Sequence, residues 1–329
     1  MRKALLIPAV LLAGCGGGGS DEPTSNVPEA GGLRQKVEAA QGVQPGDFPQ
    51  PGGKTLQRMA DEIGGAGLDV GLATSVFTAG ENRLAFGVID QQGQFVYGPT
   101  AIYVAQGPDK PAQGPYVAPA DVLVTEGRYR SKQAASEQDP FAAVYAADVR
   151  FPKKGPWSVL VVTTRDGKLV AAASQVRVTT AAKDPIPDVG EPAPKVQTDT
   201  LASAEGDVSA IDTRVPPSDM HEQSFADVVA KRPVALLFST PQLCQSRVCG
   251  PVTDVALQMK DKYGERMEFI HQEVYVGNDP AKGLRPPLKA FNLRTEPWLF
   301  VVGADGRITA RLEGSFGLSA FERALQTAL

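Results

Sequence analysis

Apolar and polar residues alternate with a period of two between residues 66 and 180, which is typical of half-buried strands. Turn signals such as Gln92-Gly93 and Asp166-Gly167 separate the alternating runs, and no amphipathic helix lies among them. The predicted strands are Asp69–Phe77, Asn82–Ile89, Gln94–Tyr97, Thr100–Val104, Asp121–Val124, Ala143–Phe151, Trp157–Thr163 and Leu169–Val178. Seven or eight short strands of this kind indicate an all-β antiparallel sandwich.

The pattern changes to alternating helices and strands over residues 201–329. Val234–Ser239 is continuously apolar, which is typical of a strand buried in the centre of a sheet. Gly303-Ala304-Asp305-Gly306 is a hairpin signal between two further strands. The predicted order is helix Asp219–Ala230, strand Val234–Ser239, helix Val252–Tyr263, strand Met267–Val276, helix Pro287–Phe291, strands Trp298–Val302 and Ile308–Leu312, and helix Leu318–Leu329. This order predicts a second domain of α/β class.

The first residues have the pattern of an export signal. Two basic residues precede a ten-residue apolar stretch, Ala4–Ala13, which is too short to span a bilayer. The following Leu12-Ala13-Gly14-Cys15 resembles the lipobox of bacterial lipoproteins, which implies that residues 1–14 are removed and that Cys15 is acylated. We therefore expect the mature chain to be a membrane lipoprotein that faces the extracytoplasmic side.

Two segments rich in Gly and Pro divide the rest of the chain. Residues 15–65 predict a lipid anchor and flexible tether with a short helix or two, and residues 181–200 predict a Pro-rich linker. The domains are therefore expected at 66–180 and 201–329. A formal net charge of −4 and a pI near 5.4 leave no basic surface for a nucleic-acid partner.

With Cys15 assigned to lipid, Cys244 and Cys249 are the remaining cysteines, and thiols outside the cytoplasm tend to be oxidised. Residues five apart on a helix differ by about 140° and about 7.5 Å, too far for a disulfide. Gly250-Pro251 favours a helix that begins at Cys249, with Cys244 in the loop before it. We expect the helix N-terminus to stabilise a thiolate at Cys249, and Arg247 would add to this if it points inward.

The last 110 residues resemble thioredoxin and the membrane-anchored thiol–disulfide oxidoreductases, with the best match over residues 287–302, Pro-Leu-Lys-Ala-Phe-Asn-Leu-Arg-Thr-Glu-Pro-Trp-Leu-Phe-Val-Val. The resemblance implies a thioredoxin fold, a cis peptide bond at Pro297 beside the sulfur atoms, and a supporting role for Trp298. Cys249-Gly250-Pro251 resembles part of the family's Cys-Gly-Pro-Cys motif, but four residues separate Cys244 from Cys249 where the family has two. Which cysteine is the nucleophile therefore stays open.

Further residues carry charge or protons near the predicted site. By the resemblance, His271 takes the place of a lysine below the second cysteine, where it would tune a thiolate, and Glu273 on the same face would orient it. Glu296 precedes Pro297, and its charge would raise the pKa values of the thiols. His271 also fits a hydrogen-bonded core histidine, Glu296 also fits a side chain turned to solvent, and His221 is interpreted as a surface residue.

These residues predict thiol–disulfide exchange with protein thiols or disulfides, without a dissociable cofactor and with an unidentified redox partner. Two alternatives remain. The wider cysteine spacing is similar to that of peroxiredoxins and of Sco-type copper chaperones, which implies a copper site of Cys244, Cys249 and His271. The second alternative is a non-catalytic binding lipoprotein in which the β-sandwich does the binding. Residues 145–151 and 155–159 resemble late strands of the immunoglobulin-like sandwiches in copper-handling proteins. That segment, however, contains no Cys, His or Met.

Overall fold

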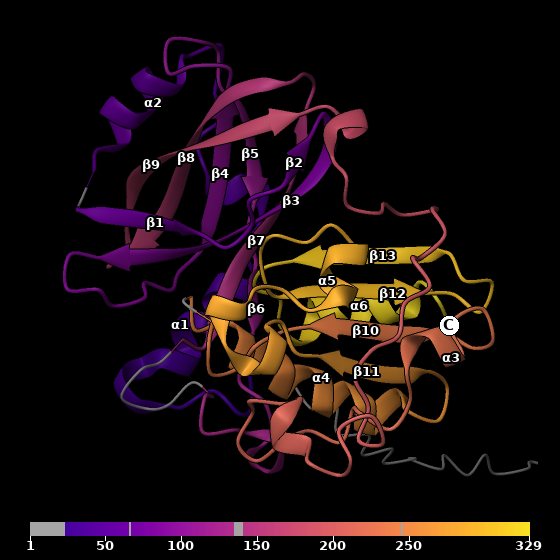
Figure 1. Cartoon of the computed structure of the whole chain (residues 1–329). Helices are drawn as coiled ribbons and strands as arrows, with labels where there is room; N and C mark the ends of the chain where they lie inside the picture. Colours follow the sequence, from indigo (N-terminus) through magenta and orange to yellow (C-terminus); the bar gives the residue numbers. More distant parts are fainter. Residues whose placement is uncertain (1–23, 66, 135–140, 245) are drawn as a thin grey trace, which may run out of the picture.

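The structure is a computed structural model that describes residues 24–65, 67–134, 141–244 and 246–329. Two sheets face each other in the N-terminal half, drawn in indigo to magenta in Figure 1. One has the strand order β1-β3-β7-β6 and the other β2-β9-β8-β4-β5. Their bounds are β1 Leu68–Leu72, β2 Phe77–Thr78, β3 Gly80–Asp90, β4 Thr100–Ala105, β5 Gln113–Val117, β6 Ala120–Val122, β7 Ala143–Phe151, β8 Gly155–Arg165 and β9 Lys168–Thr179.

Aromatic side chains of the two sheets meet between them, as expected for a sandwich. Phe151 of β7 contacts Trp157 of β8, with ring centroids 5.3 Å apart, and Phe77 of β2 packs edge-on against Phe151. The structure therefore has the two-sheet sandwich that the period-two pattern predicts.

The strand predictions differ from the structure in three places, two predicted strands and one strand that was not predicted. Asp69–Phe77 is divided into β1 and β2, and Gln94–Tyr97 forms only an isolated bridge, Ile89 to Phe95. The edge strand β5 escaped prediction because Gly114 and Pro115 interrupt its pattern, and edge strands tolerate such residues.

The segment expected to be a tether packs against the sandwich wherever it is described. Helix α1 (Leu33–Gln41) buries Val37 and Ala40, and helix α2 (Leu56–Ile63) buries Leu56 and Met59. In a flexible tether these apolar side chains would be exposed to solvent, whereas here they are buried. From residue 24 onward, this segment therefore belongs to the folded body.

The C-terminal half, orange to yellow in Figure 1, contains one four-stranded sheet with the order β11-β10-β12-β13. Strand β10 pairs parallel with β11 and antiparallel with β12, and β12 pairs antiparallel with β13. These strand directions, with a helix between β10 and β11 and another after β13, are those of the thioredoxin fold. The bounds are α3 Phe225–Val228, β10 Val234–Phe238, α4 Cys249–Tyr263, β11 Glu268–Gln272, α5 Pro286–Ala290, β12 Trp298–Val302, β13 Ile308–Glu313 and α6 Leu318–Gln326.

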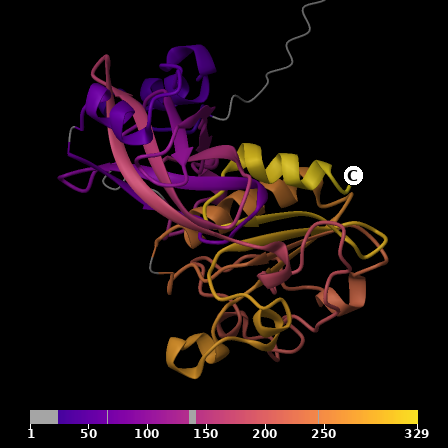
Figure 2. The ribbon, with the colours of Figure 1, turned by 90° about the horizontal axis from the view of Figure 1, so that it is seen from above.

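The two faces of this sheet contact different parts of the chain. On one face, Leu236 and Phe238 pack with α3 and α5, and with Ile186 and Ala193 of the residue 181–200 segment. That segment is therefore no free linker, and the Ala193 N–H donates to the Gly306 carbonyl at 2.9 Å. On the other face lie α4 and α6, and this side is continuous with the sandwich core (Figure 2).

Polar contacts between the halves supplement this shared apolar core. Asp121 of β6 caps the beginning of α6 by accepting hydrogen bonds from the backbone N–H groups of Gly317, Ser319 and Ala320 at 2.7–3.2 Å. Gly314 has a φ of 72°, and a Cβ there would meet the Ala73 carbonyl oxygen at 1.5 Å. The sandwich is thus fixed against the C-terminal domain, and it borders the cysteine loop described next.

Candidate active site at the cysteine loop

Cys244 lies in the loop between β10 and α4, and Cys249 is the first residue of α4, as the loop interpretation predicted. The Cys244 N–H donates to the Thr240 carbonyl at 3.1 Å, and the Arg247 N–H donates back to the Cys244 carbonyl at 3.3 Å. Arg247 adopts a left-handed backbone conformation, with φ of 60°, which turns the chain into the helix. Both cysteines are free thiols in this structure.

The two thiols lie in different surroundings, although they are hydrogen-bonded to each other. Cys249 is fully buried, and burial raises the pKa of its thiol well above the usual value, with the neighbouring Cys244 acting in the same direction. The expectation of a thiolate at Cys249 is therefore wrong. The loss of hydration outweighs the favourable position at the helix N-terminus.

Cys244 is only partly buried, and its thiol is the acidic one. A hydrogen bond from the Cys249 thiol is the largest cause that lowers the pKa of Cys244 to about 6, and Ser246 contributes a second, with Sγ and Oγ 3.2 Å apart. The backbone N–H groups of Cys249 and Ser246 also point at this sulfur. The beginning of α4 therefore stabilises a thiolate at the loop cysteine and not at its own.

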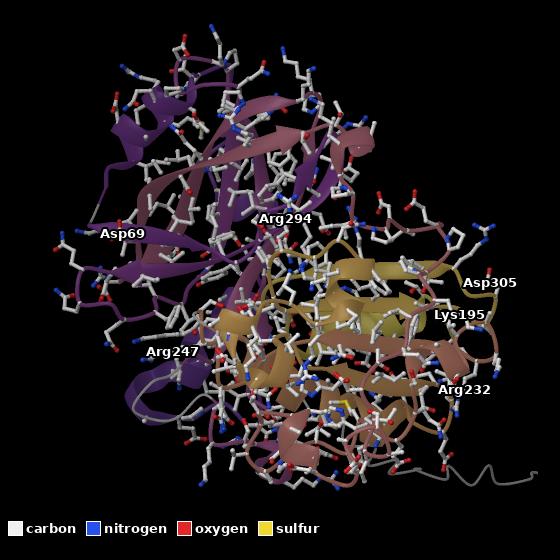
Figure 3. All side chains as sticks on the ribbon, in the orientation of Figure 1. Asp69, Lys195, Arg232, Arg247, Arg294 and Asp305 are labelled. Atoms are coloured by element: carbon white, nitrogen blue, oxygen red, sulfur yellow. The ribbon has the colours of Figure 1, made fainter. Side chains whose placement is uncertain are left out.

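Arg247, whose contribution depended on an inward orientation, is exposed to solvent. Figure 3 shows it on the side of the C-terminal domain next to the sandwich, whereas Lys195, Arg232 and Asp305 lie on the opposite side. Arg247 contributes to the geometry of the loop through its left-handed backbone turn.

The segment before β12 approaches the cysteines from the other side. The Glu296–Pro297 peptide bond is cis, which confirms the prediction for Pro297. Glu296 is partly buried, and burial together with the nearby Cys244 raises the pKa of its carboxyl to about 7. Tyr275 hydrogen-bonds to this carboxylate. The side chain of Trp298 is buried, and its Nε1–H donates to Thr295 Oγ1 at 3.0 Å, which anchors the segment.

A cleft between the two halves leads to Cys244. A cavity of about 670 Å³ is lined by Cys244, Arg247 and Pro251 on one side and by Phe95, Phe141 and Gln133 of the sandwich domain on the other. A second cavity, of about 530 Å³, shares Phe95, Phe141 and Ser246 with the first, and it reaches Glu296. We call these two spaces together the interdomain cleft. The sandwich thus supplies one wall of the space in front of the reactive thiol.

The sandwich also covers the first turn of α4. A Cβ on Gly250 would lie 2.6 Å from Cβ of Gln133, so only glycine permits this close approach. Ser131 donates to Asp254 Oδ2 through both its N–H and its hydroxyl, at 2.9 and 3.1 Å. These contacts place sandwich residues directly beside the helix turn that begins with Cys249. No pattern in the sandwich sequence indicated them, because they depend on how the two halves dock.

His271 lies on β11, but its neighbours differ from those expected. Its Nε2 contacts the Ser239 carbonyl at 3.1 Å, and its Nδ1 faces Asp212 at 3.5 Å. Glu273 accepts hydrogen bonds from the Thr213 and Val274 N–H groups and does not orient the imidazole. His221 is 3% exposed and contacts Asp212, so its interpretation as a surface residue is wrong.

The ligand set of the copper alternative is not assembled. Among the described residues, the group of at least three His, Cys, Asp or Glu side chains whose ligand atoms lie within 4.8 Å of one another consists of Asp212, His221 and His271. Cys244 and Cys249 do not belong to it.

The predicted lipid site at Cys15 lies outside the described residues. Within the part of the chain that the structure describes, no helix combines the length and the apolar character needed to cross a bilayer.

Comparisons with known proteins give likenesses of low similarity. No protein-family model and no curated protein matches the chain. Among solved structures, one described as a thiol:disulfide interchange protein DsbE from Chlorobium tepidum is 14% identical, with a TM-score of 0.31 over 43% of this chain and 98% of the other. A thiol:disulfide interchange protein of the thioredoxin family from Chlorobium tepidum TLS is 17% identical, with a TM-score of 0.29 over 42% and 94%. The fold assignment rests instead on the strand order and connections described above.

Proposed function

We propose that the chain is a thiol–disulfide oxidoreductase in which Cys244 is the nucleophile and Cys249 the resolving cysteine. The observation that carries the proposal is that the two thiols differ in pKa and in access to the cleft. Cys244 has a pKa of about 6 and lines the interdomain cleft, whereas Cys249 is buried with a raised pKa. A thiolate at neutral pH with access to a partner is what attack on a disulfide requires.

In the proposed reaction, the Cys244 thiolate attacks one sulfur of a partner disulfide. The partner's S–S bond breaks, the other partner sulfur leaves as a thiolate, and a mixed disulfide forms at Cys244. Cys249 then loses its proton and attacks the Cys244 sulfur, which releases the partner as a dithiol and leaves a Cys244–Cys249 disulfide. Two electrons pass to the partner, and a separate dithiol must reduce the chain again.

Glu296 is suited to accept the proton from Cys249. Its carboxyl has a pKa of about 7 and interacts electrostatically with both thiols. Once Cys244 is bonded to a partner it is no longer negative, so the largest nearby charge acting on Glu296 is removed and its carboxylate form becomes more favourable. The carboxylate would then take the proton at the moment when the resolving thiol must ionise.

The localisation proposed from Cys15 places this chemistry on an extracytoplasmic membrane surface, with protein disulfides as substrates. The immunoglobulin-like assignment of the sandwich also remains a prediction, and we propose that the sandwich acts as a wall of the substrate cleft.

The test is to trap the mixed disulfide with oxidised glutathione on the full chain. We expect Cys249→Ser to accumulate one glutathione on Cys244, detected by mass spectrometry of its peptides, because the resolving thiol is absent. Cys244→Ser should acquire little adduct on the buried Cys249. An adduct that forms equally in both variants would contradict the assignment of roles.

The reduction potential of the unmodified pair provides a second readout. A value of roughly −120 to −270 mV lies in the range of exchange enzymes, and one below about −300 mV would mark a structural disulfide and refute the proposal.

A further inference from the structure

Both histidines of the chain meet at one buried point beneath the cysteine loop. His271 comes from β11, whereas His221 and Asp212 come from the segment that precedes α3. His271 is 0% exposed, and Asp212 and His221 are each 3% exposed. One ligand atom from each of these three residues lies within 4.8 Å of the others. We call these residues the histidine cluster.

The separations of the ligand atoms fit a common metal ion. Asp212 Oδ2 lies 3.0 Å from His221 Nε2 and 3.5 Å from His271 Nδ1. Nitrogen and oxygen ligands bind Zn²⁺ at about 2.0–2.2 Å, so two ligands of one tetrahedral ion lie about 3.3–3.5 Å apart. The ion would therefore fit with only small side-chain shifts. Ser218 Oγ lies 2.8 Å from Asp212 Oδ2 and offers a fourth ligand atom.

The surrounding hydrogen bonds orient the ligand atoms. A carbonyl oxygen only accepts, so the contact of His271 Nε2 with the Ser239 carbonyl places a proton on Nε2 and directs Nδ1 at Asp212. Metal-bound histidines commonly donate their second N–H in this way. The carboxylate is held in turn, since Asp212 accepts from the Ser218 N–H at 2.7 Å and from the Arg214 N–H at 2.8 Å.

One of the directed atoms lacks a partner. His271 Nδ1 is buried without a hydrogen bond, since its 3.5 Å distance to Asp212 is too long for one. Buried polar atoms are nearly always satisfied by a partner, a water molecule or an ion. This nitrogen points into the group formed by the other two ligands, so a metal ion would satisfy it.

The charges around the cluster also favour a cation. Glu273 is fully buried close by, and the guanidinium of Arg214 is already paired with Asp254 at 2.9 Å.

We propose that Asp212, His221 and His271 bind one divalent transition-metal ion of the Zn²⁺ type in a closed, structural site. Two imidazoles, a carboxylate and a neighbouring hydroxyl form a nitrogen–oxygen donor set that suits Zn²⁺. The site would join β11 to the 212–221 segment, and through Thr213 Oγ1, which accepts from the Gln242 N–H at 3.2 Å, it would steady the cysteine loop.

The test uses the full chain with Cys15, Cys244 and Cys249 all replaced by Ser, so that no thiol can bind metal. After treatment with a chelator, the chain is titrated with Zn²⁺ and separately with Co²⁺. We expect one ion per chain, a higher melting temperature with Zn²⁺, and visible Co²⁺ bands of a tetrahedral nitrogen–oxygen site. Absence of stoichiometric binding in this chain would overturn the proposal, and this readout does not depend on changing any ligand.

Variants in the same background then assign the ligands. His271→Gln and His221→Gln should lose stoichiometric binding, and Ser218→Ala should weaken it by about 10–100-fold. Asp121→Asn is the matched control, a buried carboxylate at the beginning of α6 that is no proposed ligand, and it should retain one ion per chain. Binding that both histidine variants retain would refute the site. Glutathione trapping at Cys244 is measured separately from metal binding, so this proposal and the proposed function can fail separately.

Discussion

The loop of residues 240–248 and the first turn of α4 each carry one cysteine of the candidate site, but they give the two thiols opposite properties. The loop leaves Cys244 facing the interdomain cleft, with donors from Cys249 and Ser246 aimed at its sulfur. The helix turn holds Cys249 fully buried, where water cannot stabilise a thiolate. Proximity to a helix N-terminus is thus not sufficient to make a thiol acidic, because the balance between donors and desolvation decides.

The first prediction tests the difference between the two thiols by removing the hydrogen-bond donor that the helix turn supplies to the loop. In Cys249→Ala, Cys244 loses the hydrogen bond that contributes most to its acidity, so its pKa should rise from about 6 toward 9. A rise of about two units lowers the thiolate fraction at pH 7 roughly tenfold. The rate of alkylation by iodoacetamide at that pH measures this fraction.

Cys249→Ser is the matched control, because its hydroxyl can still donate to the Cys244 sulfur and should retain much of the acidity. If Cys249→Ala alkylated at the unchanged rate, the helix turn would not be the source of the low pKa.

The second prediction concerns a smaller effect, that of the Glu296 charge on the pKa of the thiols. The negative charge of Glu296 raises the pKa of Cys249 and interacts with Cys244, so Glu296→Gln should lower the midpoint of Cys244 alkylation by less than about one pKa unit. Glu205→Gln, an exposed carboxylate elsewhere, serves as the control and should leave the midpoint in place. A higher midpoint in Glu296→Gln would show that this carboxylate does not oppose the thiolate.

Much of the fold could be predicted from the sequence. The apolar run that forms β10, the hairpin between β12 and β13, and the helix start at Cys249 all follow from local patterns. Local sequence patterns failed where contacts with distant segments determine the bounds of an element. Helix α3 covers only Phe225–Val228 of a predicted Asp219–Ala230, and β5 is an edge strand containing Pro115.

The predictions for the candidate site also succeeded where local sequence preferences decide the structure and failed where long-range contacts decide it. The cysteine spacing and Gly250-Pro251 placed both thiols correctly, because turn and helix-start preferences are local. The acidity was assigned to the wrong cysteine, since it depends on the complete burial of Cys249 and on the hydrogen bonds that the Cys244 sulfur receives, which the sequence pattern does not reveal. The meeting of His221 with His271 likewise depends on long-range packing of the 212–221 segment, and nothing in the residues around His221 indicates it.

The pH profile of alkylation of the reduced full chain tests the central claim most directly, with peptide mapping to identify the modified cysteine. Because the thiolate is the reacting form, the rate rises with pH through the pKa of the thiol. The account predicts modification of Cys244 with a midpoint near pH 6, while Cys249 stays protected. A midpoint near the ordinary thiol value of about 8.5, or earlier modification of Cys249, would contradict it.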